Sequence, residues 1–124
     1  MKNKIQLIDF PIYSDARGNV IPFEFDELPF MPRRFFTTAA SAPGIIRGNH
    51  GHFVCQQIIF SISGMILVNT KSKDSQDSYV LEPNGKAIYL PAGLWCSQTF
   101  ATGQEILGCL ASHPYDARDF FETM

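Results

Sequence analysis

The sequence is short of cysteine, of net charge and of long apolar runs. Its three cysteines, Cys55, Cys96 and Cys109, form an odd count at unrelated spacings, which argues against a disulfide framework and favours a reducing compartment. The net charge is −2 and the ten lysines and arginines form no basic run, so neither nucleic acid nor a membrane is expected as a partner. Asp9 and Pro11 interrupt the first apolar residues before they reach signal-peptide or membrane-spanning length, so we expect a cytoplasmic protein.

Helical periodicity is also nearly absent, whereas short apolar or alternating runs recur between turn residues. These runs predict strands over residues 5–8, 20–25, 34–38, 45–47, 52–60, 65–70, 79–81, 87–90, 96–100 and 106–111. Turns are predicted at residues 15–19, 63–64, 71–78 and 83–85. A helix is considered only for the tail from Asp116. So many short strands indicate one all-β domain over residues 1–124, a sandwich or barrel of the jelly-roll type.

The stretch from Gly44 to Gly64 has the most distinctive spacing. Gly44 is followed after five residues by His50, then by His52, after four more by Gln57 and after six more by Gly64. This spacing resembles the first metal motif of the cupins, with Gln57 in place of the glutamate. His50 and His52 differ by two positions, so on a strand both imidazoles project from one face. Gln57 lies at an odd distance from His52 and needs a bend or bulge to reach that face.

A second stretch resembles the other cupin half-motif. Three residues match it: Gly85, Pro91 and Gly93. Cys96 stands where the third histidine ligand belongs, so an amide and a thiol replace two of the four metal ligands. We therefore expect a cupin jelly-roll β-barrel that works without a metal or another cofactor. A metal-dependent cupin that uses His50, His52 and Cys96 stays an alternative, because a thiolate still binds Zn or Cu(I).

Further residues extend this pattern over most of the chain. They are the run Arg47–Gly48–Asn49–His50–Gly51–His52, then Gln57 and Trp95, and the ending Leu110–Ala111–Ser112 with Tyr115, Asp116 and Asp119. Together they resemble the sugar 3,4-ketoisomerase family of WxcM-like cupins, whose R-G-x-H-A-H motif is met by R-G-N-H-G-H. The resemblance implies an RmlC-like cupin and an isomerase that converts dTDP-4-oxo-6-deoxyglucose into the 3-oxo sugar. In the family this reaction leads to 3-amino-dideoxy sugars of bacterial surface polysaccharides such as lipopolysaccharide.

The histidines suit such a reaction. Moving a keto group from C4 to C3 takes the proton from C3, passes through an enediol and returns a proton at C4. Histidine accepts and donates protons near neutral pH because its ordinary pKa is about 6.5. We expect His52 to be the general base, and His50 to be a proton shuttle or the donor to the enediolate oxygen. Gln57 is expected to hydrogen-bond an oxygen or fix an imidazole tautomer without adding negative charge.

Four other residues are candidates for substrate binding. A guanidinium at Arg47 could clamp the pyrophosphate, although a surface arginine is the alternative, and Arg34 has a weaker claim of the same kind. Trp95 and Phe36 could stack on thymine or line the sugar pocket, and core packing is the alternative for Phe36. The expected partner is therefore a dTDP-linked 4-oxo sugar.

The remaining expectations concern the C-terminal residues, one departure from the family's sequence pattern and the oligomeric state. Tyr115, Asp116 and Asp119 are expected to cap or lock the C-terminal segment. Phe36 lies in a run, residues 34–37, where the family commonly has Arg-x-Tyr-Tyr, and the absent hydroxyl motivates another alternative, a cupin that binds a sugar nucleotide without turnover. A homodimer is expected because small jelly rolls often hide an edge strand by dimerising.

Overall fold

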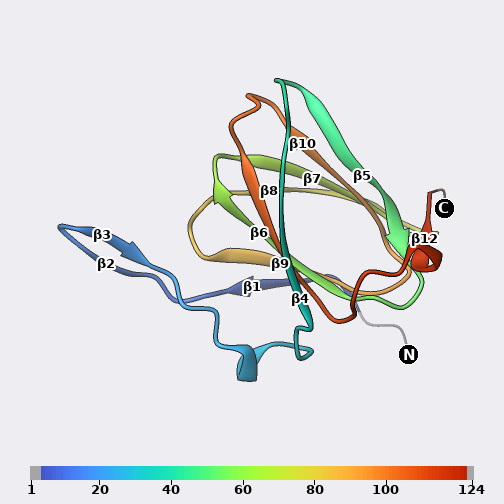
Figure 1. Cartoon of the computed structure of the whole chain (residues 1–124), viewed down its shortest axis with the longest axis horizontal. Helices are drawn as coiled ribbons and strands as arrows, with labels where there is room; N and C mark the ends of the chain where they lie inside the picture. The colour runs from blue at the N-terminus through green and yellow to red at the C-terminus, as the bar shows by residue number, and fades with distance from the viewer. Residues whose placement is uncertain (1–3, 123–124) are drawn as a thin grey trace.

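The computed structural model describes residues 4–122, and its regular elements are short strands and two 3₁₀ turns (Figure 1). The strands are β1 (Gln6–Asp9), β2 (Tyr13–Asp15), β3 (Gly18–Val20), β4 (Arg34–Ala39), β5 (Ile45–His52), β6 (Gln57–Ser63), β7 (Ile66–Lys71), β8 (Gln76–Leu81), β9 (Lys86–Leu90), β10 (Trp95–Phe100), β11 (Ile106–Ala111) and β12 (Phe120–Phe121). The turns are η1 (Phe25–Glu27) and η2 (Ala117–Asp119). Within residues 4–122, no helix is long and apolar enough to cross a membrane.

Two five-stranded sheets face each other, and a separate hairpin lies outside them. One sheet has the order β1-β9-β6-β11-β4 and the other β12-β5-β10-β7-β8, and all neighbours are antiparallel. Alternate residues of the strands point inward and form one core that includes Ile59, Ile66, Val68 and Phe100, each at most 1% exposed. The hairpin of β2 and β3 projects away from this body (Figure 1). The all-β prediction is confirmed.

A second apolar cluster covers the outer face of the first sheet. Phe60 and Tyr89 of the sheet belong to it, and the arm at residues 21–30 packs against them. The Phe23 ring lies 4.4 Å from the ring centroid of Phe60 and equally far from that of Phe10. The predicted strand 20–25 is therefore wrong beyond Val20, because its apolar residues pack onto a sheet face and do not pair with a strand.

Three other predicted elements need correction. The predicted strand 52–60 is two strands, since β5 ends at His52 and β6 begins at Gln57 in the other sheet. The predicted turn 71–78 is shorter because Gln76 already begins β8. The predicted C-terminal helix is the short turn η2 followed by β12, which pairs with the end of β5 (Figure 1). The last of these corrections brings the C-terminal segment beside the end of β5.

Candidate active site

Two histidines lie side by side on β5. The rings of His50 and His52 meet edge to face with their centroids 5.2 Å apart. A β-bulge precedes them, because the pairing between β5 and β10 skips Asn49, whose φ of 58° lies in the left-handed region. Gly48 has a φ of 84° and makes this turn of the backbone easy. A bulge re-aims the side chains that follow it, and here it precedes the histidine pair.

Both histidines line a cavity of about 180 Å³ whose walls come from both sheets. It brings together six of the residues that the sequence singled out: Arg34, Phe36, Arg47, His50, His52 and Gln57. The first two come from β4 and Gln57 from the start of β6, so β5 meets the opposite sheet here. Among the other residues that line the cavity are Gln98, Tyr115 and Phe120, which were not assigned to substrate binding or catalysis.

The two ring nitrogens of His52 have different partners. Its Nδ1 lies 3.2 Å from Oδ2 of Asp119, and its Nε2 lies 3.3 Å from the amide nitrogen of Gln57. A carboxylate can only accept, so Nδ1 carries the proton, and Nε2 accepts from the Gln57 amide. The side chains of His52 and Asp119 are each 11% exposed. His52 is therefore held as the tautomer whose lone pair is on Nε2.

Several groups act on the pKa of His52 and together they lower it. Burial of the ring is the largest cause, and the neighbouring His50 is the next, with a smaller contribution from Arg34. Asp119 opposes them, because its charge and its hydrogen bond favour the imidazolium. Since the net shift is downward from about 6.5, His52 is neutral at pH 7 and can accept a proton.

His50 is oriented by the backbone of its own strand. Its Nδ1 lies 2.8 Å from the carbonyl oxygen of Gly48, so Nδ1–H donates and the lone pair of the neutral ring is on Nε2. The Phe120 ring packs against both histidines, with centroid distances of 4.7 Å to His50 and 4.5 Å to His52. Two imidazoles of the same tautomer thus share one cavity beneath a phenylalanine.

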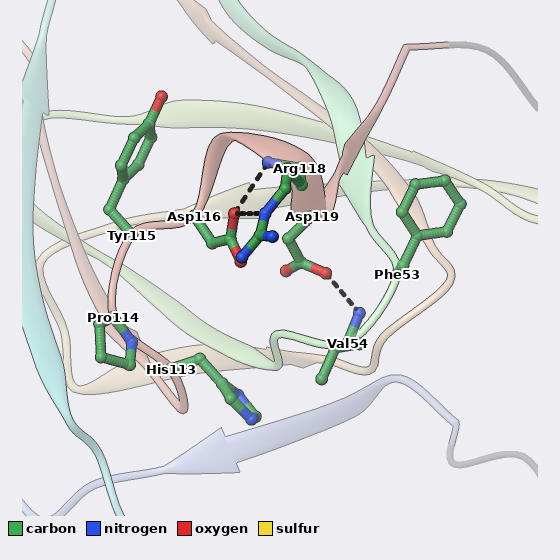
Figure 2. A pocket seen from close by; sticks show the side chains of 8 residues that line it. All are labelled: Phe53, Val54, His113, Pro114, Tyr115, Asp116, Arg118 and Asp119. Atoms are coloured by element: carbon green, nitrogen blue, oxygen red, sulfur yellow. Dashed lines mark hydrogen bonds and ion pairs between the residues drawn. The ribbon is translucent and has the colours of Figure 1, made fainter.

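The C-terminal segment delivers a carboxylate that the sequence analysis did not assign to the site. Asp119 lies 67 positions from His52 in the chain and reaches it because η2 packs beside the end of β5. Its Oδ1 accepts from the Val54 amide at 2.8 Å, as Figure 2 shows, and its Oδ2 accepts from the Cys55 amide at 3.0 Å. Asp116 instead caps η2 by accepting from the Arg118 amide at 3.0 Å. The two aspartates therefore differ: one caps a turn, and the other contacts a candidate base.

The arginines take different positions around the cavity. The Arg34 guanidinium lies 4.4 Å from the ring centre of Phe36 and 5.4 Å from that of Tyr115, which holds it between two aromatic rings. Phe36 is partly buried and also packs against the main core. Arg47 is exposed and lines the same cavity.

A match to a protein-family model identifies the family of this chain. The model for WxcM-like, C-terminal proteins (FdtA) matches residues 3–124. The chain belongs to this family. The family that the sequence motifs suggested is thus confirmed, although no curated protein sequence gives a significant match.

Solved structures of related proteins have the same fold. QdtA, a sugar 3,4-ketoisomerase from Thermoanaerobacterium thermosaccharolyticum in complex with TDP, is 25% identical, with a TM-score of 0.89 over 96% of this chain and 88% of that chain. WlaRB, a TDP-quinovose 3,4-ketoisomerase from Campylobacter jejuni, is 22% identical, with a TM-score of 0.88 over 96% and 92%. The dTDP-4-dehydrorhamnose 3,5-epimerase of Bacillus anthracis is 17% identical, with a TM-score of 0.84 over 94% and 76%. The predicted RmlC-like cupin jelly roll is confirmed.

In this WxcM-like protein Trp95 lies away from the histidines. It lines a separate hollow of about 520 Å³ on the outside of its sheet. Its Nε1–H donates to the Glu122 carbonyl at 3.0 Å, and the Lys71 ammonium lies 4.7 Å from the centre of its ring. The structure therefore does not bring Trp95 together with the other residues expected to bind substrate.

Cys96 points into the barrel, but it sits in the core and is 6% exposed. Burial raises the pKa of its thiol to about 12, and the Gln98 amide donates to Sγ at 3.3 Å. Within residues 4–122, the cluster of possible ligand atoms within 4.8 Å of one another is instead His52, Cys55 and Asp119. The Asp119 oxygens already accept three N–H groups, so this cluster is organised by hydrogen bonds.

A larger hollow of about 740 Å³ has Asp119 among its lining residues (Figure 2). Exposed residues such as Phe53, His113 and Arg118 line it, and Tyr115 borders both hollows. Arg118 is paired with Asp116 through two hydrogen bonds of 3.1 and 3.2 Å. The smaller cavity is the candidate active site, because both oriented imidazoles and Gln57 line it.

Proposed function

We propose that this protein is an isomerase that moves the keto group of a dTDP-4-oxo-6-deoxy-hexose from C4 to C3 by histidine acid–base catalysis. The observation that carries the proposal is the pair of imidazoles, 5.2 Å apart, each with Nδ1–H bonded to an oxygen of the protein. Such a pair can remove and return protons on neighbouring carbons. Membership of the family, and relatives named as sugar 3,4-ketoisomerases, support the same reaction.

In the proposed mechanism Nε2 of His52 takes the proton from C3. The C3–H electron pair forms the C3–C4 double bond, the C4 carbonyl oxygen takes up a proton, and an enediol results. His50 hydrogen-bonds the developing oxygen or shuttles the proton. In the second half, the C3 hydroxyl loses its proton, C3 becomes the carbonyl carbon, and a proton is delivered to C4. The reaction is redox-neutral overall, because one hydrogen moves from C3 to C4 and one from O3 to O4.

Four side chains are proposed to hold the substrate. Arg47 and Arg34 would contact the pyrophosphate, since a guanidinium makes paired hydrogen bonds to phosphate oxygens. Gln57 would hold the His52 ring or a sugar oxygen, and Phe36 would line the sugar pocket. Trp95 is left out of this set because its ring lies on the outer face of the sheet.

The test is incubation with dTDP-4-oxo-6-deoxyglucose in deuterated water, followed by NMR. We expect the 3-oxo sugar to form with deuterium at C4, together with solvent exchange at C3. Binding of the nucleotide sugar with neither product nor exchange would replace the isomerase by a binding cupin. A stoichiometric bound metal whose removal abolishes turnover would favour a metal-dependent cupin.

We further propose a cytoplasmic homodimer that supplies 3-oxo sugars for lipopolysaccharide. The projecting hairpin of β2 and β3 supports dimerisation, because its apolar residues Tyr13 and Val20 are 64% and 65% exposed. A protomer would cover such residues with a second copy. Sedimentation should give twice the monomer mass, and Val20→Asp should shift the protein toward the monomer. A wild-type monomer at micromolar concentration would rule out the dimer.

A further inference from the structure

We infer that Asp119 is the positioning residue that makes His52 a base: the C-terminal segment brings its carboxylate to Nδ1 and thereby fixes which ring nitrogen takes the substrate proton. The catalytic meaning of this inference rests on the proposed isomerase. The tautomer itself is a property of the protein and can be measured without substrate.

The argument begins with the difference between the two partners of His52. The Gln57 amide can rotate and offer either N–H or C=O to Nε2, so it adapts to either tautomer. The Asp119 carboxylate can only accept, so it requires a proton on Nδ1. Asp119 therefore dictates the tautomer and Gln57 follows it.

The carboxylate is itself held in place. Besides His52 it accepts from the amides of Val54 and Cys55, which lie at the corner where the chain passes from β5 to β6. The Phe53 amide also donates to the Asp119 carbonyl at 2.9 Å. Since four N–H groups converge on one residue, docking of the C-terminal segment and orientation of the base occur together.

The charges around His52 give Asp119 a second effect. His50 on the same strand and Arg34 on β4 disfavour the imidazolium, whereas Asp119 favours it. When His52 takes a proton from the substrate, Asp119 therefore supplies the stabilising charge. Without it, the ring would be a weaker base even if it stayed in place.

The experiment is a long-range ¹H–¹⁵N NMR spectrum of the histidine side chains of the full chain, without substrate. Wild-type protein should show His52 with Nδ1 protonated and Nε2 unprotonated at pH 7.5. Asp119→Ala should release this tautomer, so the two nitrogens of His52 should shift toward averaged values. Solvent exchange at C3 of the substrate should fall by roughly 10- to 10⁴-fold, the range seen when a group that orients a catalytic histidine or metal ligand is removed.

Two further variants keep the test decisive. Asp119→Asn keeps the shape of the side chain and should lower the apparent pKa of His52, so it replaces Asp119→Ala if that variant does not fold. Asp116→Asn is the matched control, since Asp116 lies on the same turn and bonds to Arg118. It should leave the His52 spectrum and the exchange rate at wild-type values.

The outcomes separate this inference from the proposed reaction. An unchanged His52 tautomer in folded Asp119→Ala, or an unchanged pKa in Asp119→Asn, overturns the inference whether or not the protein is an isomerase. An equal change in Asp116→Asn also overturns it, because the effect would then come from a loosened segment. A changed tautomer in a protein whose wild type shows no turnover supports the positioning role and rejects the proposed reaction.

Discussion

Phe121 fills the space beside Gly51 that a methyl group would need. The two residues are paired between β12 and β5, and a Cβ built on Gly51 would meet the Phe121 ring and approach the Leu94 carbonyl oxygen to 2.5 Å. Gly51 stands where the family motif has alanine, so this chain uses the absence of a side chain to bring β12 close to β5. Phe120, the neighbour of Phe121, covers the histidines from that position.

Gly51→Ala should therefore destabilise the protein by about 1–3 kcal/mol, as overpacking does at a tight site. We expect the loss to concentrate in the C-terminal segment, with faster amide hydrogen exchange at Val54 and Cys55. Chemical denaturation and exchange mass spectrometry measure both effects. In a Phe121→Ala background the same substitution should cost less; strictly additive costs would show that the Phe121 contact is not the cause.

Much of the fold was predictable because apolar alternation and strand pairing coincide in the central strands. The predictions for β4, β9, β10 and β11 agree with the structure to within one residue at each end. The predicted strands differ from the structure where apolar alternation and strand pairing do not coincide. Ile21, Phe23, Leu28 and Phe30 are apolar and pack without pairing. By contrast, β2, β3 and the start of β8 pair while exposed and carry almost no apolar signal.

The site shows the same limit at the level of single residues. The spacing in the sequence was enough to assign His50, His52 and Gln57 to one group, because all three lie within one strand and the next corner. Asp119 could not be found this way, since its contact spans 67 positions. The position of Trp95 outside the cavity could have been inferred from the sequence. It adjoins Cys96 on one strand, so the two side chains point to opposite faces of the sheet and only one of them can face the cavity.

The pH dependence should follow from the lowered pKa of His52. Burial and His50 hold this pKa below about 6.5, so the base stays neutral to lower pH than a free histidine. We expect the acid limb of kcat/KM to have its midpoint below pH 6.5, with apparent values that belong to the histidine pair. A midpoint above 6.5 would contradict the assignment of His52 as the base.

The same shift predicts the pH dependence of stability. Below about pH 6.5 the unfolded chain binds a proton at His52 before the folded protein does, so the free energy of unfolding falls as the pH falls. Denaturation at pH 7.5 and at pH 5.5 measures this loss. His52→Asn should remove part of the difference, whereas His113→Asn, which changes an exposed histidine, serves as the control.

Arg47→Lys should weaken binding of dTDP without affecting the fold. Arg47 is exposed at the cavity, and an ammonium cannot reproduce the paired hydrogen bonds of a guanidinium to a pyrophosphate. Calorimetry should show a loss of affinity of about tenfold, equivalent to roughly one charged hydrogen bond. Arg17→Lys, on the projecting hairpin, is the control, and equal affinity for all three proteins would leave Arg47 as a surface residue.

Chelation should leave the isomerase active. Cys96 is a buried thiol with a raised pKa, and the oxygens of Asp119 are occupied by N–H donors, so neither group is ready to bind a metal. Activity after dialysis against EDTA, with metal analysis of the same sample, tests this. A stoichiometric metal whose removal abolishes turnover would restore the metal-dependent alternative.

The last prediction separates the roles of the two histidines. His52→Asn should abolish both isomerisation and C3 exchange, with a loss of at least about 10²–10⁴-fold, the usual contribution of a general base. Binding of dTDP should stay near normal, because the substitution keeps a similar volume. His50→Asn should behave differently: if His50 delivers the proton to C4 or steadies the enediolate, C3 exchange survives while product formation falls. Measuring exchange and product in one tube distinguishes the two roles. If His52→Asn still exchanges the C3 proton at the wild-type rate, His52 is not the base. The assignment then passes to His50, whose Nε2 also carries a lone pair when Nδ1–H donates to the Gly48 carbonyl, or to another residue.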